Sequence, residues 1–326
     1  MPRIFVTRMI PERGLQVLYE AFGRESVHVA PQDGAIARAD LLACARGADA
    51  LLPILTDAID TEVMDAAGAH LRIIANMAVG YNNVDVDAAT QRRIAVSNTP
   101  GVLTESTADC AWALMLASAR RLGEGERLLR AGQWAGWGPM MLLGMDVHGK
   151  TLGIFGMGRI GQAVARRAAG FNMRVIYHDV SPMPPEQEAA LGATYVDKAT
   201  LLRESDFISI HCPLLPETRH AFGTAEFEAM KTTAVLVNTS RGPVVDEAAL
   251  ARALQDGAIF AAGLDVYEDE PSVHPDLLEC QNAVLIPHLG SASLETRSRM
   301  AEIAARNIVA RLRGEVPPNC VNPEAL

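Results

Sequence analysis

Short runs of apolar residues alternate along the whole chain with segments whose apolar positions recur at helical spacing. The runs predict strands at 3–7, 26–30, 50–55, 71–78, 94–98, 151–155, 174–178, 207–212, 234–238, 260–266 and 283–286. The periodic segments predict helices at 11–22, 41–45, 61–67, 85–92, 104–119, 162–169 and 246–255, and a last long helix that begins within 287–291 and ends near 313. Because strands and helices alternate, we expect an α/β fold with two doubly wound parallel sheets.

Two segments interrupt this alternation. Thr99-Pro-Gly101 separates the first set of strands from helix 104–119, which we expect to cross into a second domain. The segment 123–149 is harder to classify, because it is rich in glycine and also contains Trp134, Trp137, Pro139, Met140 and Met141. Such an arm is hard to bury within one small domain. It either contacts a second subunit or packs as a loop on its own domain.

A glycine-rich turn, Gly156-Met-Gly158-Arg-Ile-Gly161, follows strand 151–155 and precedes a helical pattern. In the dinucleotide-binding fingerprint the first glycine permits a tight turn, the second lets the backbone approach a pyrophosphate, and the third lets the helix pack on the strand. Asp179 ends the next strand, 18 residues after Gly161, where an acidic residue binds a ribose hydroxyl. We therefore expect a dinucleotide site at this turn.

Composition and charge narrow the class of protein. The 326 residues are 49% hydrophobic and 21% charged, which is typical of a soluble globular protein. A formal net charge of −10 disfavours nucleic acid or an anionic membrane as a partner, because binding phosphate groups requires a basic surface. The first residues lack the apolar core of a signal peptide, and no run of ~18 apolar residues predicts a membrane span. Five widely spaced cysteines without a CxxC pair favour free thiols in a reducing cytoplasm, and argue against disulfides or a metal site.

Arg241, Glu270 and His288 each lie just beyond the carboxyl end of a predicted strand. Taken singly, the arginine could be a surface charge, the glutamate part of a solvated acidic run, and the histidine a buried structural residue. In open α/β sheets, however, ligands bind at this edge. The run 78–83 lies at such an edge too, and its Gly80 would let the backbone approach a ligand, although an ordinary strand-to-helix loop explains the run equally well.

Together these three residue types suffice for hydride transfer to a 2-oxo acid. An arginine can hold the carboxylate with two parallel hydrogen bonds. A histidine can give a proton to the developing alkoxide. A neighbouring carboxylate favours the protonated imidazole and fixes the orientation of its ring.

The chain resembles, over essentially its whole length, the D-isomer-specific 2-hydroxyacid dehydrogenases, and most closely their glyoxylate/hydroxypyruvate reductase branch. The resemblance rests on Gly156-Met-Gly-Arg-Ile-Gly161, Asn238-Thr-Ser-Arg-Gly-Pro-Val-Val-Asp-Glu247, Gly263-Leu-Asp-Val266 followed by Glu270-Pro271, and Pro287-His-Leu-Gly-Ser291. It implies Arg241, Glu270 and His288 as the catalytic set. Glu270 is preferred over Glu268 or Asp269 because the glutamate of the family directly precedes a proline.

The resemblance also implies ligand contacts and a domain plan. Cofactor contacts are expected from Thr104, Gly156, Gly158, Arg159, Ile160, Gly161, Asp179, Cys212, Pro213, Thr218, Thr239, Ser240, Arg241, Asp265, His288 and Gly290. Substrate contacts are expected from Leu55, Val79, Gly80, Arg241, His288 and Ser291, with the N–H groups of Val79 and Gly80 on the substrate carboxylate. The family fold implies a discontinuous flavodoxin-like substrate domain, 1–98 plus 288–326, and a Rossmann NAD-binding domain, 99–287. It also implies closure on a hinge of two crossing helices, and a homodimer through the cofactor domain.

Departures from particular relatives narrow the chemistry. Reductases of this branch that prefer NADP carry a small residue and then arginine after the second strand, where this chain has Asp179-Val180, so we expect NAD(H) to be preferred over NADP(H). Phosphoglycerate-specific relatives have basic side chains in the loop that here reads Pro53-Ile-Leu-Thr-Asp57, which favours a substrate whose tail, away from the carboxylate, is small and uncharged. Formate-type members have glutamine in place of Glu270.

The favoured hypothesis is an NAD(H)-dependent reduction of glyoxylate or hydroxypyruvate to the D-2-hydroxy acid. One alternative is a related dehydrogenase that acts on phosphite or on a bulkier 2-oxo acid such as phenylpyruvate. The other is a non-catalytic protein that senses NAD(H), because such relatives carry the same three residues.

Overall fold

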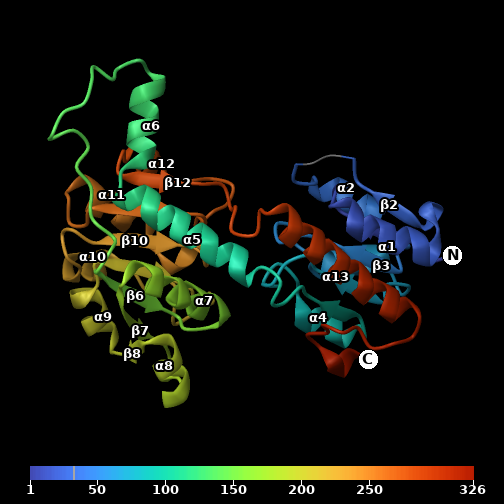
Figure 1. The fold of residues 1–326 in the computed structure, drawn as a ribbon. Helices are drawn as coiled ribbons and strands as arrows, with labels where there is room; N and C mark the ends of the chain where they lie inside the picture. The colour runs from blue at the N-terminus through green and yellow to red at the C-terminus, as the bar shows by residue number, and fades with distance from the viewer. Residues whose placement is uncertain (32–33) are drawn as a thin grey trace. The chain divides into compact units, whose positions relative to one another are not determined.

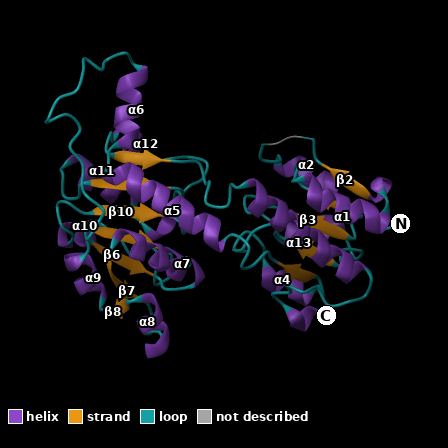
Figure 2. Cartoon of the chain, in the orientation of Figure 1, coloured by secondary structure: helices purple, strands orange, loops and turns teal. Residues whose placement is uncertain are grey.

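The computed structural model describes residues 1–31 and 34–326, which separate into two compact units (Figure 1). The first unit contains Met1–Leu103 and Ala292–Leu326, and the second contains Thr104–Ser291. Each unit is built round a parallel sheet with helices on both of its faces (Figure 2). The predicted α/β class with two doubly wound parallel sheets is confirmed.

The sheet of the first unit has five parallel strands in the order β2-β1-β3-β4-β5. They are β1 (Ile4–Val6), β2 (Val27–Val29), β3 (Ala50–Leu52), β4 (Ile73–Ala75) and β5 (Ala95–Ser97). This is the strand order of a flavodoxin-like sheet. In β1, Ile4 and Val6 pack on one face and Phe5 packs on the other, because successive side chains of a strand alternate.

Helices cover both faces of this first sheet. One face carries α1 (Glu12–Phe22) and α13 (Leu294–Leu312), and the other carries α2 (Arg38–Ala45), α3 (Thr61–Ala67) and α4 (Val86–Gln91). Helices α1 and α13 approach closely at Gly14, where an added Cβ would lie 2.7 Å from Ala301. The unit also has two short 3-10 helices, η1 (Arg24–Ser26) and η4 (Pro323–Ala325).

The sheet of the second unit has seven parallel strands in the order β12-β11-β10-β9-β6-β7-β8. They are β6 (Thr151–Phe155), β7 (Arg174–His178), β8 (Ala193–Tyr195), β9 (Phe207–Ile210), β10 (Val235–Asn238), β11 (Ala261–Leu264) and β12 (Ala283–Leu285). The direction of winding reverses at β6, which lies between β7 and β9. In a Rossmann sheet this reversal places the ligand at the carboxyl end of that strand.

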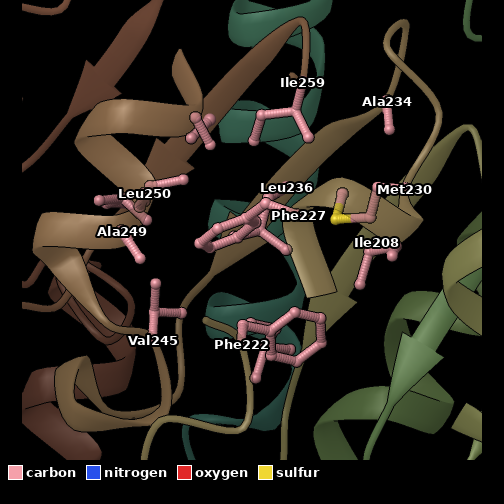
Figure 3. Packing of buried hydrophobic residues seen from close by; sticks show 14 of the residues in the cluster. Ile208, Phe222, Phe227, Met230, Ala234, Leu236, Val245, Ala249, Leu250 and Ile259 are labelled. Atoms are coloured by element: carbon pink, nitrogen blue, oxygen red, sulfur yellow. The ribbon is translucent and has the colours of Figure 1, made fainter. Parts of the chain in front are cut away.

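Helices α5 (Thr104–Ala119) and α7 (Arg159–Ala168) cover one face of the second sheet. The other face is covered by α9 (Lys198–Glu204), α10 (Thr224–Ala229), α11 (Glu247–Gln255) and α12 (Pro275–Glu279). Figure 3 shows the core on this other face, where Phe227 lies beside Leu236 of β10 and Phe222 belongs to the same buried cluster. The remaining elements are α6 (Leu122–Arg130), α8 (Pro185–Leu191), η2 (Ala169–Phe171) and η3 (Gly242–Val244).

Several expected boundaries are wrong. The last helix begins at Leu294, not within 287–291, because the Asp265 carboxylate holds the N–H groups of Leu289 and Gly290 in a turn and Ser293 caps the helix. Strand β11 ends at Leu264, so Asp265 follows the strand and does not lie in it. Elements α6, α8, α9, α10, α12 and β8 were not expected. Among the described residues, none of the helices combines the length and the apolar character that a membrane span requires.

Candidate active site

The glycine turn between β6 and α7 has the geometry that the motif requires. Gly156 has a φ of 97°, and a Cβ there would lie 2.5 Å from the backbone nitrogen of Cys212. A Cβ on Gly161 would lie 2.2 Å from the carbonyl oxygen of Gly156, so only glycine lets α7 start this close to the strand. At Gly158 an added Cβ would meet nothing within 4 Å. At Gly156 and Gly161 the turn therefore packs tightly on neighbouring backbone, whereas at Gly158 it has free space beside it.

Asp179 connects this turn to the end of β7. Its Oδ2 accepts a hydrogen bond from the Met157 N–H at 2.7 Å, and its Oδ1 accepts one from the Val180 N–H at 2.7 Å. Val180 itself is 96% exposed. The carboxylate thus lies beside the glycine turn, and the next side chain offers no positive charge.

The loop after β9 packs against the glycine turn on the side of Gly156. Cys212 is buried, and burial raises the pKa of its thiol to about 12, so the thiol stays protonated at neutral pH. The Thr218 hydroxyl donates to the carbonyl of Pro213 at 2.7 Å and accepts from the Leu215 N–H at 2.8 Å. Thr218 therefore fixes the shape of this loop, and Cys212 does not supply a reactive thiolate.

Arg241 follows the carboxyl end of β10, where Asn238 organises the backbone. The Asn238 side chain donates to the Arg241 carbonyl at 3.0 Å and accepts from the Ser240 N–H at 3.0 Å and the Ser240 hydroxyl at 2.8 Å. Burial lowers the pKa of the Arg241 guanidinium, and the nearby charge of Glu270 opposes this. Gly242 allows the contact with the next segment, because a Cβ there would lie 1.9 Å from the Tyr267 carbonyl group.

His288 and Glu270 form a hydrogen-bonded pair. The Nδ1 atom of His288 lies 2.8 Å from Oε2 of Glu270, and Oε1 of Glu270 accepts the Tyr267 N–H at 3.1 Å. Burial raises the pKa of the Glu270 carboxyl, but the hydrogen bond and charge of His288 outweigh this and leave the pKa below its ordinary value. His288 has a φ of 53°, a left-handed conformation that non-glycine residues rarely adopt.

Asp265 shapes the turn that carries His288. Its carboxylate accepts the N–H groups of Leu289 and, at 2.8 Å, of Gly290, while its carbonyl accepts the His288 N–H at 3.0 Å. Burial raises the pKa of the Asp265 carboxyl, and the two N–H donors oppose this. Ser106 of α5 adds a hydrogen bond to the Gly290 carbonyl at 2.8 Å. These contacts hold the backbone of 288–290 in place.

The structure thus brings Arg241, Glu270, Asp265 and His288 together within the second unit. Ser291, another expected substrate contact, is the last residue of this unit, whereas Leu55, Val79 and Gly80 lie in the first unit, in loops that follow β3 and β4. Asn76 donates to the Gly80 carbonyl at 3.0 Å and Asn98 donates to the Val79 carbonyl at 2.8 Å. Leu55 is half-buried in the loop after β3. Among the described residues, we find no group of His, Cys, Asp and Glu side chains that could hold a metal ion.

Comparison with known proteins places this geometry in a family. The model of the D-isomer specific 2-hydroxyacid dehydrogenase NAD binding domain matches residues 112–290. A glyoxylate reductase from Korarchaeum cryptofilum is 54% identical, and the alignment covers 100% of this chain and 97% of that protein. This chain belongs to the D-isomer specific 2-hydroxyacid dehydrogenases. As a member of that family it is an oxidoreductase that uses NAD(P) to reduce 2-oxo acids.

Solved structures of similar proteins have the same fold. A protein from Thermus thermophilus is 46% identical, with a TM-score of 0.90 and alignment over 98% of this chain and 99% of that one. An NADPH-dependent glyoxylate/hydroxypyruvate reductase from Sinorhizobium meliloti is 36% identical, with a TM-score of 0.84 over 100% of this chain and 99% of that one. The fold is therefore shared with a reductase that depends on NADPH.

The residues of the dehydrogenase fit a dinucleotide. The space beside Gly158 adjoins the N-terminus of α7, and a Cβ at this position would occupy part of that space. Helix N-termini attract phosphate groups. The Thr239 hydroxyl is buried and has no hydrogen-bond partner within the described part of the chain, so it is available to a ligand. Arg159 and Ile160 begin α7 directly beside the cradle.

Reasoning from sequence missed two residues of this site. Asn238 and Glu247 were read only as parts of a motif, yet Asn238 fixes the backbone of Arg241 and Glu247 contacts the segment that carries Glu270. Asn238 could have been found as a polar residue that ends an apolar strand run. Nothing in the pattern singles out Glu247, because its partners are backbone groups 21 and 27 residues away.

Proposed function

We propose that this dehydrogenase reduces glyoxylate or hydroxypyruvate with NADH, and that the product is the D-2-hydroxy acid where the carbon is chiral. The observation that carries the proposal is the 2.8 Å contact between His288 and Glu270 beside the half-buried Arg241. When bound, the reduced nicotinamide supplies the hydride that attacks the 2-oxo carbon. The residues of this chain supply the remaining steps.

In this proposal, Arg241 holds the substrate carboxylate and orients the carbonyl carbon. His288 uses Nδ1 to contact Glu270, which leaves Nε2 to give its proton to the oxygen of the developing alkoxide. Glu270 stays negatively charged, favours the protonated imidazole and holds the ring. In the reverse direction the neutral imidazole takes the hydroxyl proton.

We propose that 1–98 plus 288–326 acts as the substrate domain and 99–287 as the cofactor domain, bounds that differ by a few residues from those of the two compact units, Met1–Leu103 with Ala292–Leu326 and Thr104–Ser291. The N–H groups of Val79 and Gly80 would bind the substrate carboxylate, with Leu55 and Ser291 beside the substrate. Support comes from the asparagine side chains that fix the carbonyls of Val79 and Gly80. The held Val79 carbonyl sets the orientation of the peptide group that carries the Gly80 N–H, and the Ala78 carbonyl, which accepts the Thr99 N–H at 2.8 Å, sets that of the peptide group that carries the Val79 N–H.

We propose that NAD(H) is preferred over NADP(H). Asp179 presents a carboxylate beside the glycine turn, which suits ribose hydroxyls and repels a 2′-phosphate. Val180 is exposed and uncharged, so no cation is supplied there. The remaining cofactor contacts are proposed for Thr104, Arg159, Ile160, Cys212, Pro213, Thr218, Thr239, Ser240, Asp265 and Gly290.

We also propose a homodimer formed through the second unit. Helix α6 and the loop after it extend away from the sheet (Figure 1), and together they expose Leu122, Leu129, Trp134, Trp137, Met140, Met141 and Leu143. So many large apolar side chains on one segment are unusual for the surface of a monomer. A second copy of the chain would cover them.

The test is a steady-state assay of the purified protein with glyoxylate, hydroxypyruvate, phenylpyruvate and, in the oxidative direction, phosphite. Each is measured with NADH and NADPH, or with the oxidised forms for phosphite. We expect the highest kcat/KM with glyoxylate or hydroxypyruvate and NADH. A preference for phenylpyruvate or phosphite would replace the proposed substrate. Binding of NADH without turnover of any compound would favour the NAD(H)-sensing alternative.

A further inference from the structure

Glu247 is a buried carboxylate at the start of α11 that none of the steps above uses. Its Oε1 accepts the Glu268 N–H at 2.6 Å, and its Oε2 accepts the His274 N–H at 3.1 Å. These two N–H groups lie on either side of Glu270 in the sequence. One side chain therefore joins the two ends of the segment 268–274 and closes it into a loop.

A second contact runs in the opposite direction. The N–H of Glu247 donates to Oε1 of Glu268 at 2.9 Å, and Oε2 of Glu268 lies 3.0 Å from Nε2 of His220. Within the loop, the Ser272 N–H donates to the Asp269 carbonyl at 2.8 Å. The backbone on both sides of Glu270 is thus held by hydrogen bonds to Glu247, the first residue of α11, and by one hydrogen bond within the loop.

For a purely structural residue, the buried negative charge of Glu247 is poorly compensated by positive charge nearby. Burial raises its pKa, and the nearby charge of Glu268 raises it further, while the Glu268 and His274 N–H groups lower it. No arginine or lysine of the described residues forms an ion pair with it. Burying a carboxyl group is unfavourable unless its oxygens are well used, and here both oxygens are used on the loop that carries Glu270.

We propose that Glu247 is a positioning residue that keeps the Glu270 carboxylate against His288. This inference rests on the proposed function, in which Glu270 stabilises the protonated imidazole. Glu247 does not touch His288, and it acts only through the backbone of 268–274. The other charged groups that face the His288–Glu270 pair are Arg241 and Asp265, and among the described contacts neither forms a hydrogen bond or ion pair with Glu247.

The first consequence concerns the rate. In Glu247→Gln one carboxylate oxygen becomes an NH2 group that faces a backbone N–H, so one end of the loop is released. The Glu270 carboxylate then no longer holds a fixed position beside the imidazole. We expect kcat for glyoxylate reduction with NADH to fall ~10- to 10²-fold, the range that small misplacements of catalytic groups produce. The KM for glyoxylate should change little, because Arg241 is unaltered.

The second consequence concerns pH and separates positioning from simple destabilisation. When the negative charge of Glu270 moves away from His288, the protonated imidazole loses stabilisation. The upper pH limit of the reductive reaction should therefore move to lower pH in Glu247→Gln. The matched control is Asp246→Ala, which removes the cap of the same helix, a 2.8 Å contact to the Ala249 N–H, without touching the loop. It should lower the melting temperature and leave the pH limit unchanged.

A double-mutant cycle with Glu270→Gln completes the test. If Glu247 acts through Glu270, the double variant should have a kcat within about threefold of Glu270→Gln alone. If the factors by which the two single substitutions lower kcat multiply in the double variant, the inference is overturned. A wild-type pH profile in Glu247→Gln would also overturn it. If Glu247→Gln does not fold, the shorter Glu247→Asp, which cannot reach both N–H groups, is judged by the same criteria. Should His288→Ala and Glu270→Gln keep full activity, the proposed function itself fails, which is a separate result.

Discussion

At the scale of single residues, the chemistry depends on which nitrogen of His288 is free. Because Nδ1 contacts Glu270, Nε2 is left for the substrate oxygen. We expect His288→Ala to lower kcat for 2-oxo acid reduction by ~10²–10⁴-fold, the usual contribution of general acid catalysis. His148→Ala, at an exposed histidine of the same unit, is the control and should be neutral. A near-normal kcat in His288→Ala would remove this residue from the acid role.

The carboxylate of Glu270 gives a prediction about pH. Its pKa lies below the ordinary value, so the group is ionised across the neutral range. Glu270→Gln removes that charge, and the protonated imidazole is then less stable. The upper pH limit of reduction should move to lower pH, and so should the lower pH limit of oxidation, which requires the neutral imidazole. Profiles of kcat/KM measured in both directions check this, and a shift to higher pH would contradict the pairing.

Asp179 gives a prediction about the cofactor. The double variant Asp179→Ser with Val180→Arg removes a carboxylate that repels phosphate and adds a cation. Both changes lie at the position proposed to face the 2′-phosphate of NADPH. We expect the ratio of kcat/KM for NADPH to that for NADH to rise at least ~10-fold, which corresponds to ~1.4 kcal/mol. The absolute rate with NADH should fall, since Asp179 also accepts the Met157 N–H. Val180→Arg alone is the control for the added charge, and an unchanged ratio in the double variant would discredit the role of Asp179.

At the scale of elements, the strands were predictable and many helices were not. Strands β6 and β7 match their expected ranges because they are continuous, buried apolar runs. Helices α6 and α8 bury no side chain, and α12 buries only Leu277, so these helices contribute little to the core of the unit. Short helices that bury few side chains give only a weak signal in the sequence.

The same contrast holds within the candidate site. Arg241, Glu270 and His288 could be proposed from sequence because each follows a strand and carries a reactive side chain. The turn at 288–290 could not, since it depends on Asp265 accepting two N–H groups that follow a different strand. In such contacts a side chain binds backbone groups far away in the sequence. Because every residue has the same backbone groups, the sequence does not reveal which of them are bound. Sequence therefore indicates the residues that react better than those that hold them.

Asp206 gives a prediction about how elements are joined. Its carboxylate accepts the N–H of Thr151, the first residue of β6, at 2.9 Å and pairs with Lys231 at 2.7 Å. Burial raises the pKa of Asp206, but Lys231 and the Thr151 N–H outweigh this and lower it overall. We expect Asp206→Asn to lower the free energy of unfolding by about 1–2 kcal/mol near neutral pH.

The pH dependence of that loss has a definite sign. A carboxyl whose pKa is lower in the folded state stabilises the fold above its unfolded value, ~3.9, and this contribution disappears as the pH falls through the folded value. The difference between wild type and Asp206→Asn should therefore be full at neutral pH and shrink below about pH 4. Urea unfolding at several pH values measures it. Asp256→Asn, an exposed position of the same unit, is the control. A difference that grew in acid would contradict the assigned partners.

At the scale of the whole molecule, the question is what covers the arm that follows α5. Trp137 is 81% exposed and Met140 is 78% exposed in the single chain. Residues of this kind form the buried centres of stable interfaces between subunits. We expect the wild-type protein to sediment as a dimer, and the double variant Trp137→Asp with Met140→Asp to sediment as a monomer at micromolar concentration. Desolvating two carboxylates within a former apolar contact opposes association strongly.

The control for this prediction places the same charge elsewhere. Val316 is also a largely exposed apolar residue, but it lies in the first unit, so Val316→Asp should leave the dimer intact. Because Arg241, Glu270 and His288 all come from one chain, the monomeric variant should keep the hydrogen-bonded pair and a measurable kcat. A wild-type protein that sediments as a monomer would show that the arm has no second copy to contact. A dimer that survives both arm substitutions would place the interface elsewhere on the chain.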